Sequence, residues 1–341
     1  MSTRPIEQIT LEFPTMDHER RVALFTKVLA LFGPYVCDNG QFLIDIFEAA
    51  ERSRVNILPV HYYSPISEIS SYPDGESLPL LFDKSFGVDI PPISQDEFFT
   101  KVLSFSEEIG DVPYETNDSK IMRWNNGMFG VLDSCIYYAM IRAYQPSRVL
   151  EIGSGFSTLV AVAAAAKNYS TWVDCVEPYP VDFFSKHLND LPGINLTVKK
   201  IQEIPLEHFA TLKDNDILFI DSSHVVKAGS DVEYLLFRVL PALPSGVLVH
   251  FHDIYLPYSY PRSNFEHHKR FWNENYVLGA FLAGNNDWKT LISSCTLGSR
   301  DNLTELCKRI SGGNAEKTEK LLQISPGGSL WLQKRVIQRE V

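Results

Sequence analysis

The chain is organised around residues 147–158, which read Ser147-Arg148-Val149-Leu150-Glu151-Ile152-Gly153-Ser154-Gly155-Phe156-Ser157-Thr158. The apolar residues before the first glycine predict a short buried strand, and the apolar residues after Thr158 predict a helix. The two glycines remove side chains where a ligand would approach the backbone, and the N–H groups that open a helix attract negative charge. The stretch therefore predicts a strand, a turn and a helix, with a nucleotide-like ligand beside the turn.

The turn alone does not choose between nucleotide cofactors. Thr158 stands where the dinucleotide fingerprint has its third glycine, so the sequence contains only G-x-G. NAD and S-adenosylmethionine both remain compatible with this pattern. The residues of this stretch that we expect to contact the cofactor are Glu151, Gly153, Ser154, Gly155, Ser157 and Thr158.

Alternating strands and helices follow this stretch. Short apolar runs predict seven strands, at residues 149–152, 172–176, 196–198, 217–220, 247–251, 288–293 and 329–334. Helix-length intervals separate most of them, which is typical of an α/β fold with a doubly wound, Rossmann-like sheet. We expect the first five strands to be parallel and the last two to form an antiparallel edge.

The N-terminal part predicts a mostly helical extension. Apolar residues recur at helical spacing within residues 15–55, and Asp38-Asn39-Gly40 predicts a break between two helices. Residues 56–65 are rich in aromatic residues and proline, and they form either a structural arm across the core or a lid over a cleft. We therefore expect an extension over residues 1–120, serving as a lid or in dimerisation, and a catalytic domain over residues 121–341.

Composition excludes several classes of protein. The chain has 341 residues and a net charge of −11, and its longest basic cluster is Lys199-Lys200, which argues against a nucleic-acid partner. No apolar run approaches the ~20 residues of a transmembrane helix, and residues 1–7 lack the apolar core of a secretion signal. The five cysteines are scattered without a C-x-x-C pair and are expected to be reduced thiols. We expect a cytoplasmic protein that binds neither nucleic acid nor membranes.

Polar residues follow the second and third predicted strands. Because the carboxyl ends of parallel strands meet at one edge of a sheet, such residues share a crevice with the glycine turn. Glu177 is expected to accept hydrogen bonds from the ribose hydroxyls of the cofactor, and its alternative is a solvated loop acid before Pro178. Gln202 is expected to border the adenine ring.

Acids and histidines follow the next two strands. Asp221 and His224 follow the fourth strand, and His252 and Asp253 follow the fifth. An aspartate at the end of an apolar strand is costly unless something pairs with it, and a divalent metal would pair with both aspartates. Strand periodicity puts His250 on the same face as His252, but only His252 is near the mouth, so His250 is expected to be a core histidine. The predicted metal ligands are Asp221, His252 and Asp253.

In these motifs the chain resembles the class I S-adenosylmethionine-dependent methyltransferases. Within them it is similar to the metal-dependent small-molecule O-methyltransferases grouped with macrocin O-methyltransferase and the cephalosporin-hydroxylase-like proteins. The likeness covers about residues 120–260, with residues 149–155 as the cofactor motif and Asp221-Ser222-Ser223-His224 as a D-x-x-H motif. It implies that Asp221 is a metal ligand beside the cofactor and that His224 is the general base. Members of that family have two acidic residues after the fifth strand. This chain has His252 and Asp253 there, so only Asp253 matches the family pattern directly.

The predicted function is transfer of a methyl group from S-adenosylmethionine to a hydroxyl of a small organic acceptor. A divalent metal would orient and acidify the hydroxyl, and a neutral His224 would take its proton. The metal is expected to be Mg, Mn or Fe, because an imidazole beside two carboxylates also suits transition metals. The N-terminal helices offer surface for a homodimer.

Other functions stay open at this point. His224 has the alternative of an N-cap or loop histidine without a catalytic role. A nicotinamide oxidoreductase would share the fold. A non-haem iron oxygenase would use His224, His252 and one aspartate as ligands. A non-catalytic cofactor-binding or partner-binding protein would keep the glycine turn and would not require His224.

Overall fold

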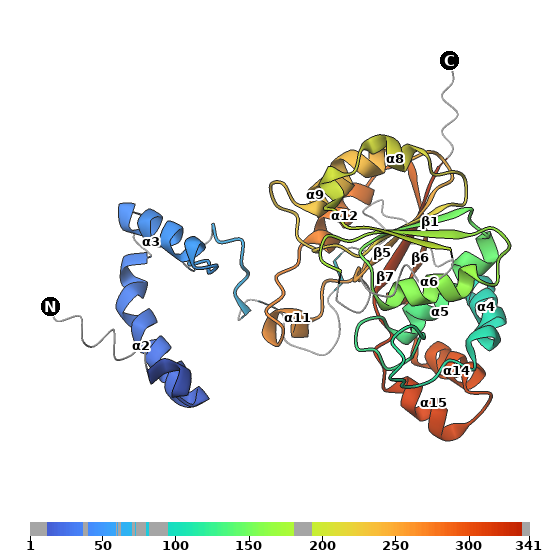
Figure 1. Cartoon of the computed structure of the whole chain (residues 1–341), viewed down its shortest axis with the longest axis horizontal. Helices are drawn as coiled ribbons and strands as arrows, with labels where there is room; N and C mark the ends of the chain where they lie inside the picture. Colours follow the sequence, from blue (N-terminus) through green and yellow to red (C-terminus); the bar gives the residue numbers. More distant parts are fainter. Residues whose placement is uncertain are drawn as a thin grey trace, which may run out of the picture. The chain divides into compact units, whose positions relative to one another are not determined.

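The computed structural model of the protein describes residues 12–36, 40–58, 60, 63–69, 72, 80–81, 95–180 and 193–335 (Figure 1). By the spatial contacts between its residues, the chain divides into two compact units, Met1–Pro73 and Asp74–Val341. The domain boundary expected after residue 120 stays a prediction of where the catalytic domain begins. Cys37 lies outside the described residues, as do Pro59, His61 and Tyr62 of the aromatic segment.

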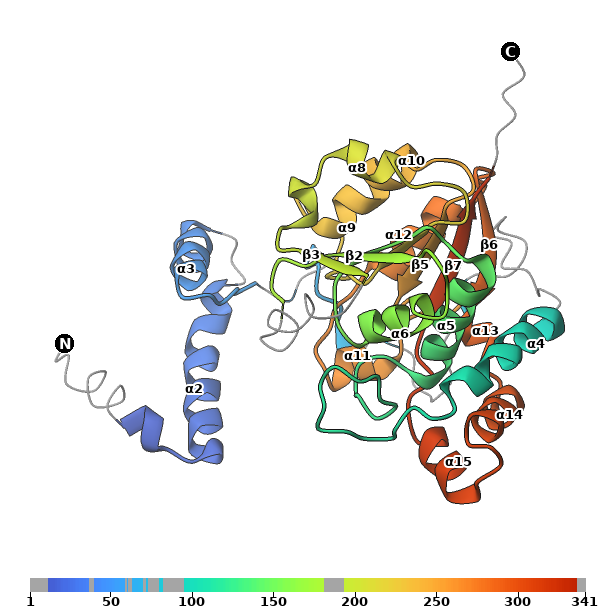
Figure 2. The ribbon, with the colours of Figure 1, turned by 45° about the vertical axis from the view of Figure 1, so that its right-hand side comes forward.

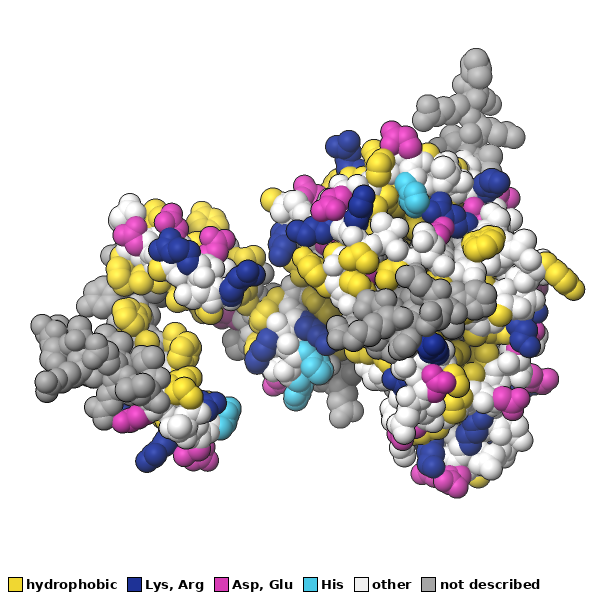
Figure 3. Space-filling view, viewed as in Figure 1, with side chains coloured by type: hydrophobic (Ala, Val, Ile, Leu, Met, Phe, Trp, Pro, Cys, Tyr) yellow, Lys and Arg dark blue, Asp and Glu magenta, His cyan; other side chains and the backbone are white. Residues whose placement is uncertain are grey.

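Within its described residues the first unit contains two α-helices, which confirms the predicted helical character of the N-terminal part. A 3₁₀ turn, η1 (Phe13–Thr15), precedes α2 (His18–Val36), and α3 (Gln41–Arg52) follows. The predicted break at 38–40 adjoins the start of α3, and its first two residues lie outside the described part. Apolar side chains of α2 are exposed, as the yellow atoms over this helix in Figure 3 show.

The second unit is built on a seven-stranded sheet with the order β3-β2-β1-β4-β5-β7-β6 (Figure 2). The strands are β1 (Arg148–Ile152), β2 (Trp172–Val176), β3 (Ile194–Thr197), β4 (Ile217–Ile220), β5 (Leu248–His252), β6 (Trp288–Ser293) and β7 (Ser329–Lys334). β1 to β5 are parallel, and β7 is antiparallel to both β5 and β6. The predicted sheet is therefore confirmed, with β7 inserted between β5 and β6 so that β6 forms the edge.

Helices cover both faces of the sheet (Figure 1). One apolar core contains residues of α4 (Gln95–Ser106), α5 (Val131–Tyr144), α6 (Phe156–Ala165) and α14 (Arg300–Ile310). The other contains residues of α8 (Leu206–Ala210), α9 (Asp231–Tyr234), the π-helical turn η7 (Leu235–Val239), α10 (Leu240–Ala242) and α12 (Glu274–Leu282). Further helical elements are η4 (Glu107–Ile109), η6 (Ile201–Glu203), α11 (Arg262–Glu266), α13 (Ser294–Leu297) and α15 (Ala315–Leu322).

The strand order indicates at which end of the sheet a ligand would bind. β1 pairs with β2 on one side and with β4 on the other, so the chain reverses its direction of winding at β1. In doubly wound sheets ligands bind beyond the carboxyl ends of the strands at this switch point. A ligand is therefore expected beyond the carboxyl ends of β1, β4 and β5.

No helix among the described residues combines the length and the apolar character that crossing a membrane requires. The cysteines within the described part, Cys135, Cys175, Cys295 and Cys307, form no disulfide. On the face shown in Figure 3, acidic and basic side chains are interspersed over the second unit.

Candidate active site

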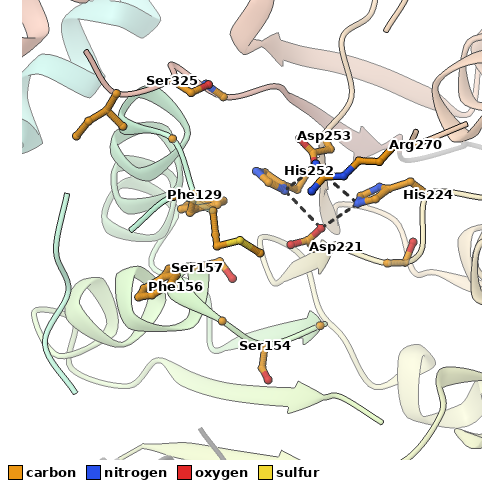
Figure 4. Close-up of a pocket in the computed structure, with 18 of the residues that line it drawn as sticks. Phe129, Ser154, Phe156, Ser157, Asp221, His224, His252, Asp253, Arg270 and Ser325 are labelled. Carbon is orange, nitrogen blue, oxygen red and sulfur yellow. Dashed lines mark hydrogen bonds and ion pairs between the residues drawn. The ribbon is translucent and has the colours of Figure 1, made fainter. Parts of the chain in front are cut away.

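A cavity of about 980 Å³ opens at the carboxyl ends of β1, β4 and β5 (Figure 4). The predicted site residues that line it are Gly153, Ser154, Gly155, Ser157, Glu177, Asp221, His224, His252 and Asp253. A second hollow of about 430 Å³ shares Gly153, Glu177 and Asp221 with it and adds Gln202. The fold thus gathers residues from four strand ends around one space. Glu151 and Thr158 line neither hollow.

The two glycines of the turn have different roles. Gly153 has a φ of 100°, and a Cβ there would lie 2.5 Å from the backbone oxygen of Asp221. Gly155 has an extended φ of −179°, and a Cβ there would meet nothing within 4 Å. Gly153 therefore lets β1 approach β4, whereas Gly155 leaves open space at the start of α6.

Replacing Gly153 with alanine is expected to lower the free energy of unfolding by about 2 to 6 kcal/mol, because positive φ and overpacking each cost about 1 to 3 kcal/mol. Urea denaturation measures the loss. Gly155→Ala is the matched control: its Cβ meets open space, so we expect a loss of about 1 kcal/mol or less. Equal losses in the two variants would contradict the assignment of different roles.

Glu151 supports the glycine turn through a hydrogen bond with Thr158. Its carboxylate is fully buried and accepts hydrogen bonds from the Tyr137 hydroxyl at 2.9 Å and the Thr158 hydroxyl at 2.5 Å. The Thr158 oxygen also accepts the backbone N–H of Gly155 at 3.0 Å. Burial raises the pKa of Glu151 to about 7, although the hydrogen bonds from Thr158 and Tyr137 oppose this shift. Glu151 and Thr158 thus support the cofactor turn from within the core.

The raised pKa of Glu151 predicts a pH-dependent stability. Because the folded pKa lies above the ordinary value, the free energy of unfolding falls as pH rises from about 4.5 through about 7. A shift of this size corresponds to about 3 kcal/mol. Glu151→Gln is expected to remove this part of the pH dependence when urea denaturation is compared at pH 5 and pH 8. Parallel curves for the two proteins would contradict the prediction.

Glu177 and Gln202, the residues expected to contact the ribose and the base, both line the smaller hollow. Glu177 is half-buried after β2, and its Oε1 accepts the backbone N–H of Tyr179 at 2.7 Å. The amide nitrogen of Gln202 donates to the backbone oxygen of Gly229 at 2.9 Å. These bonds orient both side chains beside the smaller hollow.

Asp221, His252 and Asp253 form a three-residue cluster. One potential ligand atom from each lies within 4.8 Å of the others. The Nδ1 atom of His252 is 3.4 Å from Oδ1 of Asp221 and 3.9 Å from Oδ2 of Asp253, and this buried nitrogen makes no hydrogen bond to any described residue. An imidazole nitrogen and two carboxylates are a suitable donor set for a divalent cation.

The charges in this cluster shift each other's pKa values. Burial acts to raise the pKa of Asp221, but His252 and His224 outweigh it and hold that pKa well below its ordinary value. Burial acts to lower the pKa of His252, and Asp221 and Asp253 outweigh it and raise that pKa well above the ordinary value. The carboxylates of the cluster therefore favour the positively charged form of His252.

His224 faces the same aspartates from the loop after β4. Its Nε2 lies 3.3 Å from Asp221 and 3.7 Å from Asp253, and its Nδ1 lies 3.0 Å from Oε2 of Glu274 (Figure 4 shows the Asp221 contact). Burial opposes protonation, but hydrogen bonds to Asp221 and Glu274 raise the pKa of His224 to about 10. The His224 oxygen, in a residue with φ 59°, accepts the backbone N–H groups of Asn273 and Glu274. The start of α12 thus clamps this loop.

Two buried acids in the site were not predicted from the sequence. Glu274 contacts His224, and Asp133 of α5 lies 3.5 Å from Nε2 of His252. Both residues lie on helices, where an acid in the first turn is ordinarily explained by the helix dipole. The available signal was that each opens an apolar helix. His250 lies in the core as expected, with its Nε2 2.8 Å from the Ser329 hydroxyl.

Comparison with known proteins gives the following matches. Residues 150–254 match a family model described as a methyltransferase domain. An uncharacterised protein of Archaeoglobus fulgidus is 32% identical over 178 residues, which are 50% of this chain and 80% of that protein.

Solved structures with similar folds include the O-methyltransferase TomG of Streptomyces achromogenes in complex with SAM, at 13% identity and a TM-score of 0.40 over 69% of this chain and 90% of that one. They also include an O-methyltransferase from Bacillus cereus in complex with SAH, at 12% identity and a TM-score of 0.37 over 74% and 96%.

Proposed function

The chain belongs to the same family as the archaeal protein and carries a methyltransferase domain over residues 150–254, and on that premise we propose that it methylates a hydroxyl of a small-molecule acceptor with S-adenosylmethionine. The observation that carries the proposal is the shared cavity: the glycine turn and the cluster of Asp221, His224, His252 and Asp253 line the same 980 Å³. A methyl donor and a hydroxyl acceptor would meet there. The net charge of −11 agrees with a small acceptor rather than a nucleic acid, and a cytoplasmic location is part of the proposal.

The smaller hollow and the turn would hold the cofactor. Gly155 leaves room at the start of α6 for the methionine part, and Glu177 offers a carboxylate to the ribose hydroxyls. Gln202 would border the base. Asp221 lines both hollows, so it would lie between the cofactor and the acceptor.

Asp221, His252 and Asp253 would hold a divalent metal. When bound, such an ion would act as a Lewis acid on the acceptor hydroxyl and offset the charge of the two aspartates. The nitrogen donor of His252 favours manganese or iron over magnesium, which prefers an all-oxygen shell. The orphaned Nδ1 of His252 supports this assignment.

His224 would accept the proton of the hydroxyl through Nε2, which faces the cavity. Glu274, buried behind the ring, would keep the other proton on Nδ1 and fix the orientation of the imidazole. A pKa of about 10 means that His224 holds its proton at neutral pH while the carboxylates of Asp221 and Glu274 both carry their charges. The base role therefore requires the charge of Asp221, which is also a proposed metal ligand, to be offset.

Aromatic and basic side chains border the acceptor side of the cavity. Tyr255, Arg270 and Trp272 line it, and the Arg270 guanidinium lies 5.1 Å from the centroid of Trp272. Among the described residues, no ion pair involves Arg270. A planar organic acceptor that carries an acidic group would suit these walls.

The proposal is tested by incubating the purified chain with S-adenosylmethionine labelled in its methyl group and a panel of hydroxylated aromatic acids and diols. Mass spectrometry should find the label on an acceptor oxygen, with manganese present. Oxygen consumption with iron and no methyl transfer would favour the oxygenase. Cofactor binding without turnover on any acceptor would favour the non-catalytic protein.

A further inference from the structure

Asp133 is a buried acid with an unusual lack of partners. Its side chain is fully buried in the first turn of α5, and neither carboxylate oxygen makes a hydrogen bond to any described residue. Among the described residues, the ionisable side chain that forms an ion-pair contact with it is His252, whose Nε2 lies 3.5 Å from Oδ2 of Asp133. Burying a carboxylate in this way is costly unless a cationic or proton-donating group faces it. The position of Asp133 therefore depends on His252.

The loop before β7 closes the space around Asp133. Gly327 has a φ of 99°, and a Cβ there would lie 1.9 Å from Oδ2 of Asp133. The backbone oxygen of Pro326 accepts the N–H groups of Leu132 and Asp133, each at 3.2 Å. The ring of Phe129 packs on His252 with 5.0 Å between centroids. The loop thus packs onto the carboxylate of Asp133, and Phe129 packs against the ring of His252.

The opposite edge of the His252 ring faces two more carboxylates. Nδ1 lies 3.4 Å from Asp221 and 3.9 Å from Asp253 and makes no hydrogen bond. A neutral imidazole carries one proton, and Asp133 offers an acceptor for it at Nε2. With the proton there, Nδ1 and the two carboxylates are all electron-pair donors, and a cation is the group that can join them.

We propose that Asp133 is the positioning residue that makes His252 a metal ligand, by keeping its proton on Nε2 and its lone pair on Nδ1. The inference rests on the metal site of the proposed function and adds a residue to it. Carboxylates behind a ligand histidine fix its tautomer and raise its basicity, and their loss typically weakens metal binding about 10- to 100-fold. Asp133 thereby also strengthens the preference for metals that accept nitrogen donors.

The test compares two isosteric variants of the full chain. Calorimetric titration with Mn²⁺ should show that Asp133→Asn binds about 10- to 100-fold more weakly than the unchanged protein. Asp216→Asn is the matched control, because it also neutralises a buried carboxylate, but Asp216 accepts hydrogen bonds from Ser147 and the backbone N–H of Arg148 and lines neither hollow of the site. Its Mn²⁺ affinity should stay within about threefold. In a His252→Asn background, Asp133→Asn should cause no further loss.

A second measurement uses the unchanged protein, so it does not depend on the variant folding. Nitrogen NMR of protein labelled at histidine, with Zn²⁺ bound, should show the proton of His252 on Nε2. A proton on Nδ1 would overturn the inference.

The outcomes separate the two proposals. If the unchanged chain binds no Mn²⁺, the metal site of the proposed function falls together with this inference. If it binds Mn²⁺ and folded Asp133→Asn binds equally well, the role of Asp133 alone is overturned.

Discussion

Replacing His224 with glutamine is expected to lower kcat of methyl transfer by about 100- to 10,000-fold, the usual contribution of a positioned general base. Glutamine keeps a polar side chain of similar reach and cannot take a proton at neutral pH. Cofactor affinity, measured by calorimetry, should stay within about threefold, because His224 lines the larger cavity and not the smaller hollow. The effect should therefore appear in kcat.

His250→Gln is the matched control for this variant. His250 is also a buried histidine, but it lies within β5, stacks on Trp331, forms a hydrogen bond with the Ser329 hydroxyl and does not line the cavity. This substitution should lower stability and leave kcat of the folded protein within a few fold. If His224→Gln turns over at an unchanged rate, His224 is a loop histidine and the base assignment is wrong.

Removing a metal ligand is expected to have an effect of similar size. Asp253→Asn should weaken Mn²⁺ binding by more than the roughly 10- to 100-fold that is typical of outer partners, because a direct ligand is lost. Methyl transfer should fall with metal occupancy and should recover in part at high Mn²⁺. Asp253 is chosen over Asp221 because it does not line the cofactor hollow, so cofactor affinity should be retained.

Chelation gives the complementary experiment. Treatment of the unchanged protein with a chelator should abolish turnover, and Mn²⁺ should restore more of it than Mg²⁺ does at equal concentration. Full activity after complete removal of divalent metals would refute the metal-assisted mechanism. Glu177→Gln serves as the control, because it should weaken cofactor binding without changing Mn²⁺ affinity.

The fold was largely predictable because buried parallel strands are short apolar runs that end in polar residues. The match of residues 150–254 to a methyltransferase domain confirms the resemblance to class I S-adenosylmethionine-dependent methyltransferases. The start of β3 was missed by two residues, since Gly193 makes the turn directly before Ile194. The insertion of β7 between β5 and β6 was not predictable, because pairing between strands far apart in sequence leaves no local pattern.

The candidate site was predictable where it follows the strands. β4 and β5 are neighbours in the sheet, so Asp221 and Asp253 had to lie close together. Glu151 was expected to contact the cofactor. The alternation of side chains along β1 instead points it toward α5, where the Tyr137 hydroxyl donates a hydrogen bond to its carboxylate. Asp133 and Glu274 come from helices, and only tertiary packing brings them to the histidines.

The loop before β7 and β7 itself are synthesised after the rest of the site. Asp133 and the strand ends that carry Asp221 and His252 leave the ribosome before Gly327, which packs on Asp133, and before Ser329, which pairs with His252. Until then the end of β5 that carries His252 lacks its neighbouring strand, and no loop packs on the carboxylate of Asp133. The proposed metal site would therefore be completed late in biosynthesis, and a nascent chain should acquire its affinity for metal only after the last strand has joined the sheet.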